Sequence, residues 1–203
     1  MIRIPHQRGG WLEVICGPMF SGKSEEMIRR LRRAEIAGQR VVIFKPQIDD
    51  RYDVEDVVSH AGIRMRAVPV SSVPELMTRS AGFDVVGIDE VQFFETSVVG
   101  SALELANGGV RVVAAGLDQD FRRLPFGPMP ALLSLAEFVD KMHAICVVCG
   151  SPAHFTQRTA GGEELVQVGD SESYEARCRA CYELGLAKTG DREESAVRTH
   201  DRD

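Results

Sequence analysis

Residues 17–24 read GPMFSGKS and directly follow the apolar run WLEVIC of residues 11–16. The octapeptide fits the phosphate-loop pattern G-x-x-x-x-G-K-[ST], in which backbone N–H groups cradle phosphate oxygens, the lysine reaches the terminal phosphates and the hydroxyl reaches Mg²⁺. A Cβ at either glycine would block the backbone from closing on the anion. The predicted cradle comprises Gly17, Pro18, Met19, Phe20, Ser21, Gly22, Lys23 and Ser24, and it relies on the amides from Phe20 onward because proline has no N–H.

The sequence on either side of the loop supports this interpretation over a surface turn that matches the pattern by chance. WLEVIC has the composition of a buried strand. Residues 23–40 place Met27, Ile28, Leu31 and Ala34 on one helical face, and Gly38 supplies a stop signal. A strand, a glycine loop and a helix in this order put the anion at a helix N-terminus, where free N–H groups favour it.

The rest of the first 143 residues alternates between β-prone and helical patterns. Because the expected strands lack polar alternation, both faces of their sheet should be buried under helices. This predicts an α/β fold, in which a parallel sheet that follows the phosphate-loop pattern is flanked by helices. The further expected strands are residues 40–45, 84–89 and 110–116, the expected helices are residues 74–81, 97–108 and 130–140, and residues 46–73 read as part loop with short β runs.

Length and composition bound the organisation of the chain. Its 203 residues suffice for one domain and a small appendage, and a net charge of −6 argues against a general nucleic-acid binder. We expect an N-terminal extension (1–10), an ATP-binding domain (11–143), a small zinc-binding domain (144–187) and a disordered tail (188–203). With no apolar run long enough for a membrane or a signal peptide, we expect a cytoplasmic protein without a membrane partner. The arginines of residues 29–33 read as a solvated helix face.

Four of the five cysteines form two C-x-x-C pairs, CVVC and CRAC. In a reducing compartment, such pairs indicate a tetrahedral zinc site rather than disulfides, and four protein ligands make the zinc structural rather than catalytic. The alternative is one or two unrelated pairs of reduced thiols. The predicted zinc ligands are Cys146, Cys149, Cys178 and Cys181, whereas Cys16 reads as a small buried residue. Residues 150–177 lie between the pairs, and a hairpin of CVVCGSPAHFTQR with EELVQVG is expected around residues 160–162.

The third expected strand ends in the acidic pair Asp89 and Glu90. A carboxylate in this position holds Mg²⁺ in phosphate-loop proteins, and its neighbour can activate water or a substrate hydroxyl. The alternative is an acidic pair that only caps a turn. Residue patterns alone therefore give a Mg-ATP phosphoryl-transfer protein with a structural zinc, and they leave the acceptor open. A zinc-ribbon ATPase acting on nucleic acid and a non-catalytic zinc module that binds a protein are the competing hypotheses.

An ordered set of further motifs resembles the zinc-containing type of thymidine kinase. After GPMFSGKS come FKPQIDDRY, IDEVQFF, GLDQDFRRLPFGPMP, LAEFVDKMHAICVVCGSPAHFTQR and SYEARCRAC, which together cover most of residues 11–182. The resemblance implies transfer of the γ-phosphate of ATP to the 5′-hydroxyl of thymidine or deoxyuridine, for nucleoside salvage. It also implies a RecA-like phosphate-loop fold, with a parallel sheet flanked by helices and a small zinc-binding lasso domain, and it implies a homotetramer.

The same resemblance assigns roles to residues of this chain. Glu90 would take the 5′-hydroxyl proton, Lys23 would stabilise the transferring phosphoryl group, and Ser24 with Asp89 would hold Mg²⁺. Arg51 would be a further catalytic contact, oriented by Asp49. The remaining residues expected at the nucleotide are Val91 and Gln92, with Gln92 and Phe93 toward the nucleoside.

For the nucleoside, the resemblance implies a loop between the cysteine pairs that folds over the base and binds it with backbone groups. An apolar pocket would enclose the thymine ring and its methyl group. The expected substrate residues are Met19, Phe93, Leu117, Phe121, Phe126, Thr156, Gly169 and Tyr174. One departure is Gln167, where some relatives have an apolar residue.

Overall fold

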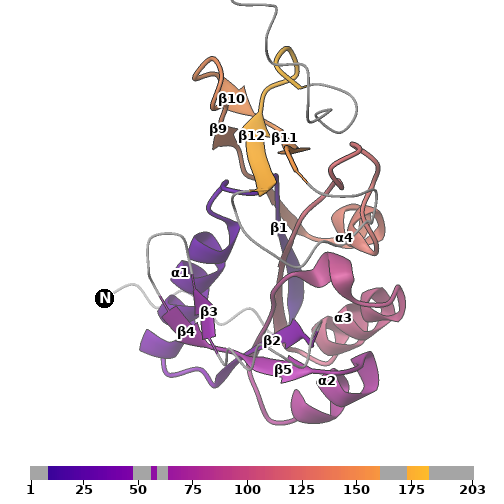
Figure 1. The fold of residues 1–203 in the computed structure, drawn as a ribbon. Coiled ribbons are helices and arrows are strands. Elements are labelled where there is room, and N and C mark those ends of the chain that lie inside the picture. Colours follow the sequence, from indigo (N-terminus) through magenta and orange to yellow (C-terminus); the bar gives the residue numbers. More distant parts are fainter. Residues whose placement is uncertain (1–8, 48–55, 59–63, 161–172, 183–203) are drawn as a thin grey trace, which may run out of the picture.

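Six parallel strands form the central sheet of the computed structural model, in the order β5-β2-β6-β7-β1-β8 (Figure 1). The structure describes residues 9–47, 56–58, 64–160 and 173–182. The sheet strands are β1 (Trp11–Cys16), β2 (Val41–Pro46), β5 (Val68–Val70), β6 (Val85–Ile88), β7 (Arg111–Gly116) and β8 (Phe138–Lys141). The helices are α1 (Lys23–Ile36), α2 (Val73–Arg79), α3 (Ser97–Asn107), α4 (Met129–Leu135) and the short 3₁₀ turn η1 (Val91–Phe93).

Helices cover both faces of this sheet, as the apolar strands predicted (Figure 1). On one face, Ile15 of β1 packs with Met27 and Leu31 of α1. On the other, Leu12 and Val14 of the same strand pack with residues of α2, α3 and α4. The alternation along β1 explains why its sequence is apolar at adjacent positions, and the α/β fold class is confirmed. Within the described ranges, none of the helices has both the length and the apolar character needed to cross a bilayer.

The expected helix over residues 130–140 is wrong in its second half. The helix ends at Leu135, and residues 138–141 form β8, which pairs with β1 at the edge of the sheet. The pairing starts at Glu137, whose N–H donates to Leu12 and whose carboxylate accepts the Leu12 N–H at 2.8 Å. The open backbone groups of β1 therefore decided the conformation of this segment over its helical pattern.

Residues 46–73 contribute short strands, as their β runs suggested. β5 extends the sheet beside β2, while β3 (Asp56–Val58) and β4 (Arg64–Arg66) form an antiparallel pair.

Four short strands beyond β8 form a separate group above the sheet edge at the top of Figure 1. We call residues 144–160 and 173–182 the cysteine unit. It contains two antiparallel pairs, in which β9 (Ala144–Ile145) pairs with β10 (Pro152–Ala153) and β11 (Phe155–Arg158) pairs with β12 (Tyr174–Arg177). β11 pairs with residues 174–177, a partner that the sequence did not indicate, whereas EELVQVG, its expected partner, lies outside the described residues.

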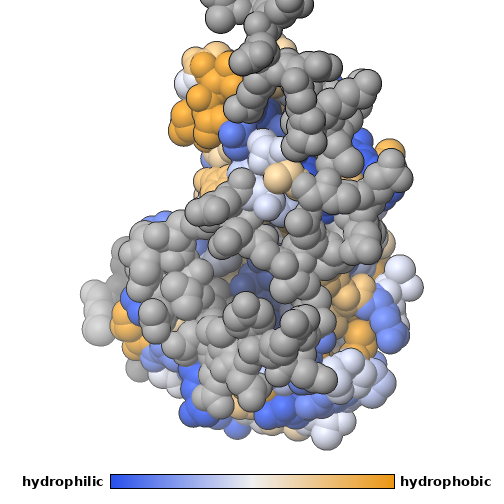
Figure 2. Space-filling model, in the orientation of Figure 1, coloured by the Kyte–Doolittle hydropathy of each residue, from blue (hydrophilic) through white to orange (hydrophobic). Residues whose placement is uncertain are grey.

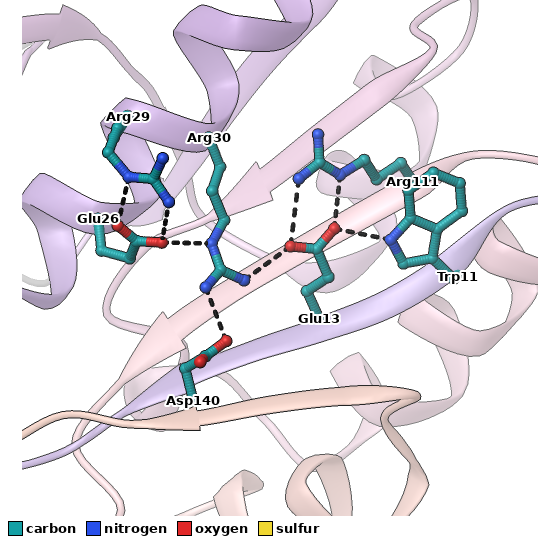
Figure 3. Close-up of polar contacts among 7 residues, drawn as sticks. All are labelled: Trp11, Glu13, Glu26, Arg29, Arg30, Arg111 and Asp140. Carbon is teal, nitrogen blue, oxygen red and sulfur yellow. Dashed lines mark hydrogen bonds and ion pairs between the residues drawn. The ribbon is translucent and has the colours of Figure 1, made fainter. Parts of the chain in front are cut away.

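The arginines of α1 are not uniformly solvated. Arg29 is exposed, but the side chain of Arg30 is only 13% exposed and forms ion pairs with Glu13, Glu26 and Asp140 (Figure 3). Glu13 also binds Arg111 at 2.6 Å. Burial acts to raise the pKa of Glu13, but hydrogen bonds from Arg111, Trp11 and Arg30 outweigh it, so the pKa is lowered. The network joins α1, β1, β7 and β8, and the prediction of a solvated face was wrong for Arg30.

Candidate active site

The phosphate loop links the C-terminal end of β1 to the N-terminus of α1. Gly17 has φ +140° and Gly22 has φ +82°, conformations that side chains rarely adopt. A Cβ at Gly17 would lie 2.4 Å from the carbonyl oxygen of Met142, whereas one at Gly22 meets no protein atom within 4 Å. Gly17 is therefore required by both space and conformation, and Gly22 by its left-handed conformation alone.

Two side-chain hydrogen bonds lie within the phosphate loop. The Lys23 ammonium and the Ser21 hydroxyl both donate to the carbonyl oxygen of Pro18, each at 2.8 Å. Burial lowers the pKa of Lys23, while the negative charges of Glu90 and Asp89 oppose that shift. The ammonium thus lies in the field of the acidic pair as well as at the N-terminus of α1, where the first backbone N–H groups have no partner within the helix.

Asp89 and Glu90 follow β6, as the sequence predicted, and lie in different environments. Asp89 is buried, and burial together with the charge of Glu90 raises its pKa to about 7. A buried carboxylate beside a second carboxylate is stabilised in its charged form by a cation, so this pair fits a divalent metal. Glu90 adopts a left-handed conformation at φ +50°, which is uncommon for a residue with a side chain.

Gln92 fixes the carboxylate of Glu90. Its Nε2 donates to Glu90 Oε2 at 2.6 Å, and its Oε1 accepts the Leu117 N–H at 3.0 Å. The amide therefore connects the end of β6 to the end of β7. By contrast, the side chain of Val91 is fully buried in the core, so only its backbone can face a nucleotide.

The phosphate loop is bonded to the cysteine unit. The Met19 N–H donates to the hydroxyl of buried Thr156, in β11, at 3.0 Å. The ring of Phe20, at φ +65°, packs against the small core of the cysteine unit, which includes Cys146 and Cys178. The sequence predicted both partners as binding residues but not this direct contact, which joins positions far apart in the chain.

Four of the eight expected nucleoside residues lie in two groups. Phe93 and Phe126 form an edge-on pair with ring centroids 5.4 Å apart. Phe121 and Tyr174 both lie against the guanidinium of Arg158. Leu117 directly follows β7, and its N–H donates a hydrogen bond to the side chain of Gln92. The remaining candidates Gly169, Arg51 and Asp49, and the departure at Gln167, lie outside the described residues.

The four paired cysteines converge. Their sulfur atoms all lie within 4.8 Å of one another, and the Sγ atoms of Cys149 and Cys178 are 3.6 Å apart. Tetrahedral Zn–S bonds of about 2.3 Å imply a sulfur separation of about 3.8 Å, so the arrangement fits zinc. Each of the two C-x-x-C pairs contributes two sulfur atoms to the cluster, which supports one shared metal site over unrelated thiol pairs. Next to Cys146 and Cys149, the exposed side chains of Ile145, Val147 and Val148 form an apolar patch near β9 and β10 (Figure 2).

The acidities of these thiols support the same conclusion. Burial acts to raise the pKa of Cys146, but hydrogen bonds from the backbone of Cys178, Cys149 and Val148 lower it to about 6. Interactions with the thiols of Cys149 and Cys178 raise the pKa of Cys181 to about 12. Four neighbouring sulfurs cannot all ionise unless a cation compensates their charge, and zinc supplies that charge. The cysteine cluster therefore fits structural zinc.

Two features of the site had no clear signal in the sequence. Asp118, buried after β7, forms an ion pair with Lys141 at 2.7 Å across the end of β1. Arg158 is buried between the aromatic residues named above. The only hint was their position, since Asp118 lies in GLDQDF and Arg158 in HFTQR, both part of the motif set.

A glycine phosphate loop, an acidic pair after a neighbouring strand and a parallel sheet define a phosphate-loop nucleotide-binding protein of the α/β class. The cysteine unit, which carries a four-cysteine cluster and is hydrogen-bonded to the phosphate loop, further restricts which phosphate-loop proteins this chain can resemble. The family model described as thymidine kinase matches residues 10–182. The chain belongs to the thymidine kinase family, and its function is that of a nucleoside kinase, with a nucleoside and ATP as the substrates that the family implies.

Proposed function

We propose that this protein transfers the γ-phosphate of ATP to the 5′-hydroxyl of thymidine or deoxyuridine, giving the monophosphate for DNA precursor synthesis. The observation that carries the proposal is the hydrogen bond from the Met19 N–H to Thr156, at 3.0 Å. It holds the loop that would bind the donor phosphates against the unit that would bind the nucleoside. A phosphoryl transfer needs this proximity, because catalysis depends mainly on positioning and charge stabilisation.

The donor side would be formed by the phosphate loop. Because the Met19 N–H is engaged by Thr156 and Pro18 has no N–H, the amides from Phe20 to Ser24 would cradle the phosphates. Lys23 would leave the Pro18 carbonyl to contact the transferring phosphoryl group. Ser24 and Asp89 would hold Mg²⁺, whose charge neutralises that developing on the phosphate oxygens.

Glu90 would act as the general base. Gln92 holds its carboxylate in place with a 2.6 Å hydrogen bond, which leaves the second carboxylate oxygen for a substrate hydroxyl. An oriented carboxylate beside the phosphate loop can accept the proton as the hydroxyl attacks phosphorus. We retain Arg51, oriented by Asp49, as a proposed further contact to the phosphoryl group.

The nucleoside side would be formed by Met19, Leu117, the three phenylalanines at 93, 121 and 126, and residues of the zinc-pinned segment. Thr156 and Tyr174 anchor the two strands from which that segment starts and returns, and Gly169 lies within it. Backbone groups that pair with the pyrimidine edge would reject cytosine, because its donor and acceptor are exchanged and buried groups would stay unpaired.

We further propose a homotetramer in a reducing compartment such as the cytoplasm. Free thiols at the zinc site suit that compartment. β8 lies at the sheet edge with Phe138 and Val139 about half exposed, and such edges favour pairing with another chain. Light scattering coupled to size exclusion should give four times the 22.3 kDa chain mass. A monomer at working concentrations would contradict this.

The decisive experiment measures ATP consumption and monophosphate formation with thymidine, deoxyuridine, deoxycytidine, single-stranded DNA or no acceptor. We expect stoichiometric product with thymidine and deoxyuridine and little turnover otherwise. ATP hydrolysis that needs no nucleoside and is stimulated by DNA would instead support the competing zinc-ribbon ATPase. No turnover under any condition would favour a non-catalytic zinc module.

A further inference from the structure

Arg158 is the largest side chain that the described residues bury completely, with 1% of its surface exposed. It ends β11, two residues after Thr156. Removing a guanidinium from water is costly unless its charge and its donors are compensated. A residue in this position is therefore expected to have strong local partners.

The partners include two aromatic rings that we have placed in the nucleoside site. The guanidinium carbon lies 3.7 Å from the ring centre of Phe121 and 5.3 Å from that of Tyr174. Both distances are within cation–π range, and a planar guanidinium at the shorter distance stacks on the ring. In addition, Nη2 donates a hydrogen bond of 2.7 Å to the hydroxyl of Tyr174.

Other contacts hold the backbone of the Phe121 loop on the cysteine unit. The hydroxyl of Tyr182 donates to the carbonyl oxygen of Phe121. Arg123, in the same loop, lies over the rings of Phe155 and Tyr182 at 4.4 and 5.2 Å. These contacts place the loop, whereas the contact from Arg158 fixes the Phe121 ring itself.

The geometry assigns Arg158 the role of a positioning residue for base recognition, and we propose that it sets the preference for thymidine over deoxyuridine by locking Phe121 against the 5-methyl group. The inference rests on the proposed function. Because the Tyr174 hydroxyl accepts from Arg158, its own hydrogen points elsewhere and is available to a neighbouring acceptor. Arg158 thus orients one apolar and one polar element of the site without reaching the substrate.

The test compares Arg158→Lys with the wild-type, zinc-loaded protein. Lysine keeps the positive charge but lacks the planar guanidinium and its forked N–H donors, so it should hold the Phe121 ring less firmly. We expect the KM for thymidine to rise about 10- to 30-fold, with the KM for ATP within about twofold. The ratio of kcat/KM for thymidine to that for deoxyuridine should move about threefold toward unity, because the methyl group loses its contact.

Arg122→Lys is the matched control. Arg122 also lies over Phe121, at 5.6 Å, but its side chain is 49% exposed and bound to Asp120. We expect the KM values for thymidine and for ATP to stay near wild type, because lysine keeps the positive charge beside buried Asp120 and the Arg122 side chain is half exposed. Zinc content and melting temperature show whether each variant is folded.

Tyr174→Phe keeps the test decisive if the Arg158 variant does not fold. It removes only the hydrogen bond, and the KM for thymidine should rise about fivefold. An unchanged thymidine to deoxyuridine ratio in folded Arg158→Lys would overturn the inference, as would equal losses for ATP and nucleoside. If the wild-type protein itself phosphorylates neither nucleoside, the proposed function fails, and that outcome is distinct from failure of this inference.

Discussion

The two halves of the active site are built in different ways. The phosphate half comes from one continuous segment, residues 17–24, whose backbone takes its shape from two glycines and the start of α1. The nucleoside half is assembled from separated segments around residues 93, 121, 156 and 174, joined by rings, a buried arginine and the cysteine cluster. We therefore expect the phosphate half to depend mainly on local geometry, and the proposed nucleoside half to depend on long-range packing and on zinc bound by the four cysteines.

The largest expected effect concerns the chemistry of the phosphate half. Glu90→Gln removes the proposed base but keeps the size of the side chain, so kcat should fall about 10³-fold while the KM values for ATP and for thymidine change little. Steady-state kinetics of monophosphate formation measure this. Glu95→Gln, at a nearby exposed position, is the control and should be neutral. A Glu90→Gln enzyme with near-normal kcat would remove Glu90 from the mechanism.

A second change breaks the contact between the halves. Thr156→Val keeps the shape of the side chain but leaves the partly buried Met19 N–H without its acceptor, which costs about 2 kcal/mol. Because Met19 is the residue expected to touch the base, kcat/KM for thymidine should fall about 30-fold and the KM for ATP should change within about threefold. Thr156→Ser, which keeps the hydroxyl, should recover most of the activity. Equal activity of the Val and Ser variants would contradict the role of this bond.

The smallest expected effect on turnover lies in a region outside both halves. Glu13→Gln removes the carboxylate shared by Arg30 and Arg111, so it should lower the free energy of unfolding by about 2 kcal/mol at pH 7 and leave kinetic constants unchanged. The Glu13 pKa is lowered from its usual 4.5 by folding, so this stabilisation is present above that pH and is lost as the pH falls below it.

Urea unfolding at two pH values measures this effect. The difference between wild type and Glu13→Gln should shrink at about pH 3. Glu35→Gln, on the exposed side of α1, should show no difference at either pH. If the difference in unfolding free energy between wild type and Glu13→Gln is the same at both pH values, the Glu13 charge is not the source of the stability.

The comparison also explains what the sequence could predict. The phosphate loop, the acidic pair and the four cysteines were found because their chemistry requires fixed residue types at short spacing. The strand at residues 138–141 was missed because its conformation depends on the free edge of β1, and β12 was missed as the partner of β11 because pairing is a long-range choice. Arg30 was read as part of a solvated helix face, and nothing in the sequence indicated that Arg158 is buried, because burial of a charge becomes visible only when its distant partners are known.

The central claim is that zinc supports the nucleoside half more than the phosphate half, even though Phe20 of the phosphate loop packs against the cysteine unit, and metal removal tests this claim most directly. Zinc would be extracted by a chelator under reducing conditions, and the Kd values of thymidine and of ATP would be measured separately by calorimetry before and after. We predict that the Kd of thymidine rises at least about tenfold, since the cysteine unit loses its anchor, while that of ATP stays within about threefold. Re-addition of zinc should restore the original Kd of thymidine. Equal losses for the two ligands, or none for thymidine, would contradict the account.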